Sequence, residues 1–299
     1  MQRKADIKRV IYGTARLGNF DYGFSNNISL DFDERIHLIN KIIELGIFRF
    51  DTSPRYKNAE LILGKAISKL TSTILIDTKV VDLIPYANNS EKIIFQQVEK
   101  SLKTLNKESI NVLYLHQNQI EIISDINIQK SLNKLLDLGL VKKIGISVYN
   151  HNELDYGLRS TLFSVIQAPV NVLNHSFYNK FINSNKASNK ELVARSIFLQ
   201  GALLNVGKNK LNKLNLELSK KIKLLNEICT NRKTTIENQA KYSVFELSDI
   251  SVIQSSLSLN NISSNLIYQK DSGNNIVHEQ VKKIMDSEYS FTNPRNWNY

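Results

Sequence analysis

The chain has 299 residues, of which 42% are hydrophobic and 22% are charged. A chain of this length buries about three quarters of its unfolded surface, so its core needs no disulfide or metal. The single cysteine, Cys229, excludes a disulfide framework and a thiolate metal cluster. No apolar run reaches the roughly 18 residues of a membrane span, and the usual glycine-rich nucleotide motifs are absent. We therefore expect a cytoplasmic protein that binds neither metal nor membrane.

Lysine and arginine total 39 against 28 acidic residues, which gives a formal net charge of +11. Such an excess is typical of proteins that bind nucleic acid. The lysines are, however, spread over most of the expected helices, and no basic stripe with interleaved aromatic residues occurs. We therefore expect a small-molecule ligand and no nucleic-acid partner.

Short apolar runs alternate with amphipathic segments along the chain. Eight runs read as strands buried on both faces: Val10–Tyr12, Ile47–Phe50, Ile74–Ile76, Val112–Leu115, Ile144–Ile146, Phe163–Ile166, Ile197–Leu199 and Ile250–Ile253. Apolar residues at helical spacing predict helices between them: Asp33–Leu45, Ser90–Leu105, Asn127–Leu138 and Leu211–Asn226. Ser90 is a candidate helix cap, and Gly46 and Gly139 are candidate helix-ending glycines.

Alternating strands and helices imply a parallel sheet in an α/β protein. Closing eight such units gives a single-domain (β/α)8 TIM barrel; an open, doubly wound sheet is the alternative, although its glycine-rich first turn is absent. We expect residues 1–270 to form the barrel and residues 271–299 to form a C-terminal tail of the same domain, with a helix over Ile276–Met285. The aromatic residues of the tail either line a pocket or pack on the barrel wall: Phe291, Trp297 and Tyr299.

Polar residues end five apolar runs: Asp51, Lys79, His116, Ser147 and Gln167. The C-terminal ends of barrel strands meet at one mouth, so these side chains would share it, and Tyr56 lies in the loop after Asp51. Each of them alone is more often a cap, a core group or a packing residue than a functional one. Burying an aspartate near a lysine is costly unless the two pair, which favours a functional interpretation of the set.

This set suits the reduction of a carbonyl group. A tyrosine hydroxyl is a poor acid near neutral pH, and the ammonium of Lys79 would lower the pKa of Tyr56. Asp51 would hold Lys79 in place, and His116 would donate a hydrogen bond to the substrate oxygen. Because no side chain supplies a hydride, a cofactor is required. The alternative from the same residues is an aldolase in which Lys79 forms a Schiff base.

The segment Gly46–Tyr56, followed by Glu60 and Gly64, resembles the signature of the aldo-keto reductases. Asp77–Lys79 is similar to the lysine strand of that family, and Tyr114–His116 is similar to its histidine strand. The likeness continues through other segments: Gly13–Ala15, Gly145–Ser147, Gln167–Asn171 and Arg195–Gly201. Two short segments, Asp21–Gly23 and Arg195–Ser196, resemble most closely the bacterial branch found beside sugar and polysaccharide genes.

The resemblance implies a barrel oxidoreductase that converts an aldehyde or ketone to an alcohol, or the reverse, with NADP(H) expected rather than NAD(H). It implies that Tyr56 donates the proton and that Lys79 and Asp51 adjust the acidity of Tyr56. It also implies that His116 orients a small carbonyl or sugar-derived substrate. The resemblance also implies contacts to the cofactor, including Gly13 and Thr14. Ser147 and Gln167 would contact the nicotinamide, and Ser255, Ser256 and Asn265 would contact the adenosine end. The residues along the pyrophosphate would be Ser196, Phe198, Gln200 and Gly201.

Several positions depart from the common pattern of the family. Val148 stands where an asparagine is common, and Arg195 where a tyrosine often stacks on the nicotinamide. Ser255 replaces a glycine or lysine, and Asn261 replaces a basic residue that grips the 2′-phosphate. Losing a basic residue there removes a charge-assisted contact to NADP(H). A non-catalytic or weakly active barrel with a binding or regulatory role is therefore the alternative function.

Overall fold

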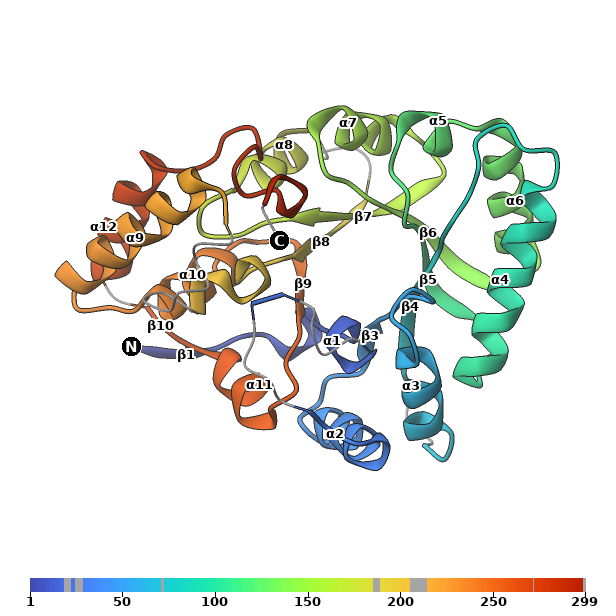
Figure 1. Cartoon of the computed structure of the whole chain (residues 1–299), viewed down its shortest axis with the longest axis horizontal. Coiled ribbons are helices and arrows are strands. Elements are labelled where there is room, and N and C mark those ends of the chain that lie inside the picture. The colour runs from blue at the N-terminus through green and yellow to red at the C-terminus, as the bar shows by residue number, and fades with distance from the viewer. Residues whose placement is uncertain are drawn as a thin grey trace.

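The computed structural model describes residues 1–18, 23–24, 29–70, 73–184, 189–204, 214–270 and 272–297. Eight parallel strands close into a barrel in chain order (Figure 1). The (β/α)8 prediction is confirmed, and the open sheet is excluded. The strands are β2 (Val10–Gly13), β3 (Arg49–Asp51), β4 (Leu75–Val80), β5 (Ile110–Leu115), β6 (Val141–Ser147), β7 (Phe163–Pro169), β8 (Glu191–Arg195) and β9 (Ile250–Gln254).

Helices surround this barrel, as Figure 1 shows for α2 and α3 on one side and α7 and α8 on the opposite side. They are α1 (Ala15–Gly18), α2 (Phe32–Glu44), α3 (Ala59–Ile67), α4 (Ser90–Leu105), α5 (Ile120–Ile123), α6 (Ile126–Asp137), α7 (His151–Arg159), α8 (Ser176–Ser184), α9 (Leu216–Asn231), α10 (Ile236–Phe245), α11 (Leu259–Asn265) and α12 (Ser272–Lys282), with 3₁₀ helices at Ile7–Arg9, Leu199–Leu204 and Pro294–Asn296. Within the described ranges, no helix combines the length and the hydrophobicity that a membrane crossing needs.

A small second sheet lies outside the barrel. Its two strands, β1 (Gln2–Lys4) and β10 (Ile267–Gln269), pair in antiparallel fashion with Arg3 opposite Tyr268. This pairing joins the start of the described chain to the segment that follows the last barrel strand and its helix.

The first turns of α2 and α4 differ in how they are capped, and the predicted cap of α4 is wrong. At α2, Asp31 Oδ1 accepts from Glu34 N at 2.8 Å, and Glu34 Oε2 accepts from Asp31 N at 2.8 Å. This capping box fixes the first turn. Ser90 is not the cap of α4: it is the first helical residue, and its hydroxyl donates to Ala87 O at 2.8 Å. Asn89 holds the cap position without a side-chain hydrogen bond.

The predicted strand Ile197–Leu199 is wrong. The strand is β8, Glu191–Arg195, and Leu199 begins a 3₁₀ helix instead. Strand β8 has a charged residue at each end, and Glu191 accepts a hydrogen bond from Arg49 inside the barrel. A search for continuous apolar runs misses β8 because the strand begins with a charged residue, Glu191. This charge is stabilised by Arg49 on β3, which a local sequence pattern does not reveal.

Two helices begin or end away from their expected limits. The described part of the Leu211–Asn226 prediction overlaps α9, which starts at Leu216 and continues to Asn231; residues 211–213 lie outside the described residues. Asn215 sets the start of α9, since its side chain accepts from Leu218 N at 2.7 Å. Near the tail, α12 covers Ser272–Lys282, several residues earlier than the predicted Ile276–Met285.

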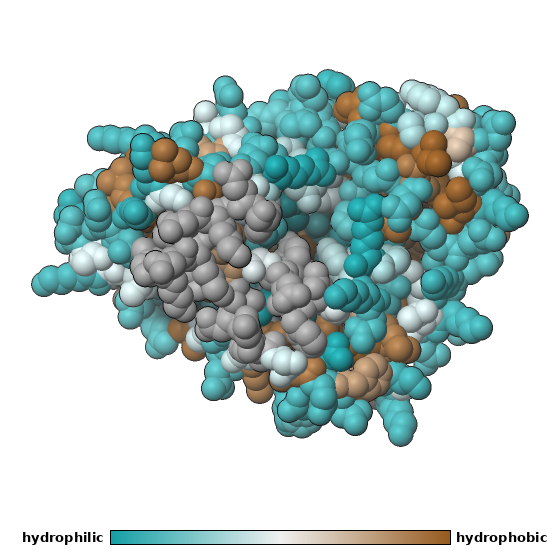
Figure 2. Space-filling view, in the orientation of Figure 1, coloured by the Kyte–Doolittle hydropathy of each residue, from teal (hydrophilic) through white to brown (hydrophobic). Residues whose placement is uncertain are grey.

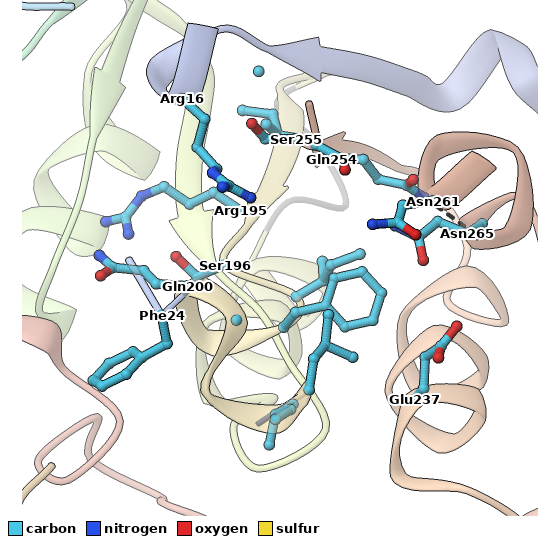
Figure 3. A pocket seen from close by; sticks show the side chains of 18 of the residues that line it. Arg16, Phe24, Arg195, Ser196, Gln200, Glu237, Gln254, Ser255, Asn261 and Asn265 are labelled. Atoms are coloured by element: carbon cyan, nitrogen blue, oxygen red, sulfur yellow. Dashed lines mark hydrogen bonds between the residues drawn. The ribbon is translucent and has the colours of Figure 1, made fainter. Parts of the chain in front are cut away.

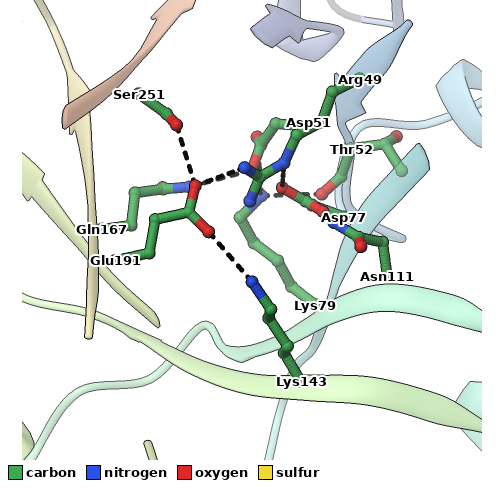
Figure 4. A network of polar contacts seen from close by, with 10 residues as sticks. All are labelled: Arg49, Asp51, Thr52, Asp77, Lys79, Asn111, Lys143, Gln167, Glu191 and Ser251. Carbon is green, nitrogen blue, oxygen red and sulfur yellow. Dashed lines mark hydrogen bonds and ion pairs between the residues drawn. The ribbon is translucent and has the colours of Figure 1, made fainter. Parts of the chain in front are cut away.

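The inside of the barrel holds both an apolar cluster and a charged network. The apolar cluster consists of Ile11, Val112, Tyr114, Val165 and Val193. In the charged network, Arg49 Nε donates to Asp77 Oδ2 at 2.8 Å, and its Nη1 donates to Glu191 (Figure 4). Ser251 and Lys143 also contact Glu191, at 2.9 and 3.5 Å. Side chains from five strands are therefore linked across the barrel.

Candidate active site

Asp51 and Lys79 form an ion pair between β3 and β4. Lys79 Nζ donates to Asp51 Oδ1 at 2.8 Å, to Asp51 Oδ2 at 2.9 Å and to Thr52 O at 2.7 Å. Gln167, on β7, donates through Nε2 to Asp51 Oδ2 at 2.9 Å (Figure 4). Asp51 is 4% exposed and Lys79 is 2% exposed. Both buried charges are thus paired and hydrogen-bonded, which is the condition under which such charges are tolerated.

Tyr56 and His116 lie beside this ion pair. Lys79 Nζ is 5.3 Å from the centroid of the Tyr56 ring. The ring centroids of Tyr56 and His116 are 6.4 Å apart, with the rings nearly perpendicular. His116 directly follows β5, and Ser53 Oγ lies 3.3 Å from its Nδ1. The structure therefore brings together the four side chains that the sequence suggested for catalysis.

The loop that carries Tyr56 is held in place by its neighbours. Tyr56 N donates to Ser53 O at 2.9 Å, and Tyr56 O accepts from Ala59 N at 2.9 Å. A Cβ atom on Gly18, at the end of α1, would lie 1.7 Å from Tyr56 O. Only glycine allows α1 to approach the loop this closely, so Gly18 helps to place the tyrosine.

The electrostatic surroundings keep Tyr56 protonated and His116 neutral near pH 7. Burial raises the pKa of Tyr56 well above its ordinary value of 10, the Asp51 carboxylate raises it further, and the Arg195 guanidinium opposes the shift. Lys79, which was expected to lower the pKa of Tyr56, is instead committed to Asp51 and Thr52. Burial, with the nearby Lys79 and other cations, lowers the pKa of His116 to about 3.

A cleft of about 690 Å³ opens beside Asp51 and Tyr56. Its size is within the usual range for small-molecule sites. Nine of the predicted cofactor residues line it: Gly13, Gln167, Ser196, Phe198, Gln200, Gly201, Ser255, Ser256 and Asn265. Two others lie outside its lining. Thr14 is buried and donates through Oγ1 to Asp51 O at 3.1 Å, and Ser147 is buried at the end of β6.

The two ends of the cleft differ in charge (Figure 3). Arg16 and Arg195 lie at one end, whereas Glu237, Asn261 and Asn265 lie at the other. Glu237 is on α10 and pairs with Lys241 Nζ at 2.9 Å. Sequence reasoning did not find Arg16 or Glu237, because neither ends a strand and the packing of α10 against the cleft has no local sequence signal.

The wall of the cleft after β8 has an unusual backbone. Ser196, Leu199 and Gln200 have φ angles of 61°, 47° and 54°, in the left-handed region that non-glycine residues rarely occupy. Phe24 N donates to Gln200 O at 2.7 Å, which holds this turn from outside. Strained residues of this kind cost about 1–3 kcal/mol each and cluster at binding sites. The strain therefore favours a binding role for this segment.

Two of the tail aromatics pack against the body of the protein and do not line the cleft. Phe291 and Trp297 are each 6% exposed and belong to a hydrophobic cluster with residues of α9 and α12. Trp297 Nε1 donates to Phe291 O at 3.0 Å, and its ring centroid is 5.9 Å from that of Phe24, a residue of the cleft wall. Tyr299, as well as Asp21 and Tyr22 of the branch motif, lies outside the described residues.

Comparisons with known proteins show the family to which the chain belongs. The model of the aldo/keto reductase family matches residues 9–285. D-arabinose 1-dehydrogenase of Saccharomyces cerevisiae is 32% identical over 111 residues, which are 35% of this chain and 33% of that protein. The chain spans about half the length, or less, of the curated relatives it matches.

Two solved structures share the fold. The holo form of aldo-keto reductase AKR11C1 from Bacillus halodurans has a TM-score of 0.74 and 18% identity, covering 93% of this chain and 92% of that one. An aldo-keto reductase from Klebsiella pneumoniae in complex with NADPH has a TM-score of 0.68 and 14% identity, covering 95% and 93%. The match of the family model over nearly the whole chain shows that this protein belongs to the aldo/keto reductase family, as the sequence predicted.

Proposed function

We propose that this chain reduces an aldehyde or ketone to an alcohol, or catalyses the reverse reaction, with a nicotinamide dinucleotide bound in the cleft. The observation that carries the proposal is the grouping of Asp51, Tyr56, Lys79 and His116 at the cleft, which is large enough for a dinucleotide. A small carbonyl compound or sugar derivative remains the proposed substrate, and the absence of a nucleic-acid partner remains a prediction.

The cleft wall fits a dinucleotide in its hydrogen-bonding chemistry. Gln254 is 3% exposed and lines the cleft, and its Oε1 atom is buried without a hydrogen-bond partner among the described residues. A buried acceptor of this kind is costly unless a donor reaches it. Amino and hydroxyl groups of the dinucleotide supply such donors, and the neighbouring Ser255, Ser256 and Asn265 offer further polar contacts.

In this proposal, Tyr56, His116 and Lys79 each have a separate role in the reaction. A nicotinamide cofactor, when bound in the cleft, would supply the hydride for the carbonyl carbon. Tyr56 gives its hydroxyl proton to the carbonyl oxygen; burial and the Asp51 carboxylate hold its pKa above the ordinary value, so the hydroxyl is protonated at neutral pH but is a weaker acid than a free tyrosine. His116, which is neutral, donates a hydrogen bond to the same oxygen as negative charge develops there. Lys79, held by Asp51, places a positive charge beside the tyrosine ring.

The choice of cofactor is decided at the adenosine end of the cleft. The resemblance predicts NADP(H) over NAD(H), and this preference remains a prediction. Against a strong preference, the described lining of that end contains the carboxylate of Glu237 and no lysine or arginine. A carboxylate accepts hydrogen bonds from ribose hydroxyls and repels a 2′-phosphate. We therefore expect any preference for NADPH to be small.

The first experiment replaces Tyr56 with phenylalanine. Tyr56→Phe removes the transferable proton and leaves the ring, so kcat on a panel of aldehydes should fall by about 10²- to 10⁴-fold. The dissociation constants of NADPH and NADH should change less than twofold. Binding can be followed by the fluorescence of Trp297, the single tryptophan, which contacts the wall residue Phe24.

Other outcomes of this experiment separate the alternatives. Cofactor binding without turnover in the unsubstituted protein would favour a binding or regulatory role. Full activity of the Tyr56→Phe variant would remove this residue from the proton-donor role. Covalent trapping of a carbonyl substrate on Lys79 by borohydride would favour the aldolase.

A further inference from the structure

Tyr149, in the loop between β6 and α7, is stacked by two arginines. The Cζ atom of Arg195 is 4.0 Å from the centroid of the Tyr149 ring, and the Cζ atom of Arg295 is 3.9 Å from the same centroid. One face of a phenol ring has room for one guanidinium, so the two arginines lie on opposite faces. Two positive charges are thereby held no more than about 8 Å apart, and an anion at the edge of the Tyr149 ring, beside both guanidinium groups, would stabilise this arrangement.

Both arginines are fixed at the mouth of the barrel. Arg195 ends β8, lines the cleft with Tyr56, and donates through Nη2 to Val148 O at 3.0 Å. Arg295 comes from the tail and donates through Nη2 to Asn118 Oδ1 at 3.3 Å. Asn118 lies two residues after His116 and donates to Glu153 Oε2 at 2.6 Å. Arg295 is therefore tied to the loop that carries the proposed carbonyl-orienting histidine.

The segment that carries Arg295 is anchored to the barrel. Asp286 Oδ2 accepts from Thr292 N at 2.9 Å and from Thr292 Oγ1 at 2.8 Å. Asp286 N donates to Leu173 O at 2.7 Å, and Asn174 Nδ2 donates to Asp286 O at 2.7 Å. These bonds attach the tail to the segment after β7. They give Arg295 a defined position although its side chain is exposed to solvent.

Three acidic groups near the mouth of the barrel already have partners other than Arg295. Asp51 pairs with Lys79, and Asp82 pairs with Arg55. Glu153 accepts from Asn118, from Tyr149 N and from Asn150. Among the described residues, no carboxylate forms an ion pair with Arg295. Burial is the main cause of the lowered pKa of His116; the cations Lys79, Arg55 and Arg195 lower this pKa further, and Asp82 opposes them.

We propose that the substrate carries an anionic group, a carboxylate or a phosphate, and that Arg295 and Arg195 bind this group while the carbonyl lies between Tyr56 and His116. The inference rests on the proposed carbonyl reduction. On the face shown in Figure 2, strongly hydrophilic side chains border a hollow near the centre. Guanidinium groups suit both anions because they offer paired N–H donors in a plane. Arg195 lines the cofactor cleft and Arg295 does not, so Arg295 is the residue of the pair that we assign to the substrate alone.

The test compares two aldehydes that differ in charge and little in shape. These are 4-carboxybenzaldehyde and its neutral methyl ester, each measured with saturating NADPH and NADH. The unsubstituted protein should favour the acid in kcat/KM by about tenfold or more, the worth of one charge-assisted hydrogen bond. Arg295→Leu should remove that advantage through KM, so that the acid and the ester become equal in kcat/KM, and Arg295→Lys should restore part of it. Glyceraldehyde and its 3-phosphate, compared in the same way, distinguish a phosphate from a carboxylate preference.

A matched control separates local recognition from net charge. Arg159→Leu removes one positive charge at the exposed end of α7 and should not change the ratio between acid and ester. If the ratio is near one in the unsubstituted protein, or if Arg295→Leu does not alter it, the inference is wrong and carbonyl reduction stands. If no aldehyde is turned over, the proposed function fails. Calorimetry with the acid and the ester then decides the inference alone: it stands if tighter binding of the acid depends on Arg295, and it falls otherwise.

Discussion

The buried ion pair of Asp51 and Lys79 allows a quantitative prediction about stability. Replacing Lys79 with methionine removes all three of its hydrogen bonds and leaves the Asp51 carboxylate with only Gln167 as a side-chain donor. Asp51 is 4% exposed, so most of its carboxylate would lose a partner in a buried environment. Breaking a buried pair from one side costs about 3–5 kcal/mol. In a protein of 299 residues, that loss lowers Tm by roughly 5–8 °C.

The double variant Asp51→Asn, Lys79→Met tests the origin of this loss. It removes the isolated charge, so we expect it to recover at least half of the stability that Lys79→Met loses, with a coupling energy of about 2 kcal/mol or more. Urea unfolding followed by circular dichroism measures all of these variants. As a control, Lys282→Met breaks the exposed pair of Lys282 with Glu279 and should leave the free energy of unfolding almost unchanged. A loss below about 1 kcal/mol for Lys79→Met, or strict additivity in the double variant, would refute the reasoning.

Two further predictions concern the cleft and the buried histidines. Glu237→Gln removes a negative charge from the adenosine end of the cleft. The ratio of the NADH to the NADPH dissociation constant, measured by fluorescence titration, should therefore rise about five- to tenfold. No change in this ratio would mean that Glu237 does not face the 2′-phosphate. Burial lowers the pKa of His175 to about 3, so between pH 6.5 and pH 3 the unfolded chain binds a proton that the native protein does not, and stability falls as the pH falls. At pH 5 the loss in the free energy of unfolding due to His175 is about 2 kcal/mol. The His175→Gln variant should therefore lose less stability between pH 7 and pH 5 than the unsubstituted protein does. Equal losses in both proteins would show that His175 is not the cause.

Sequence reasoning found the residues whose position in the chain fixes their position in space. Asp51 and His116 stand where a barrel strand ends, so once eight strand–helix units are recognised they must meet at the mouth. Lys79 lies one residue before the end of β4 and reaches the same point. For these residues, the order of strands and helices in the chain is enough to predict that their side chains lie close together.

The residues that the sequence did not reveal depend on long-range packing. Strand β8 was missed because Glu191 is stabilised by Arg49, which is 142 residues away. Glu237 reaches the cleft only because α10 packs beside it, and Arg295 reaches the mouth only because Asp286 anchors the tail. Each of these placements depends on partners that no local pattern displays.

The charged network inside the barrel has a consequence for how the protein folds. Arg49 and Asp77 come from the first half of the chain, whereas Glu191 and Ser251 come from the second half. A partial barrel that ends before β8 would leave the Arg49 guanidinium without one of its two carboxylates in a low-dielectric interior. Half-barrel intermediates are therefore penalised, and the two halves should gain stability together. We expect a single cooperative unfolding transition for the barrel, with no stable N-terminal fragment.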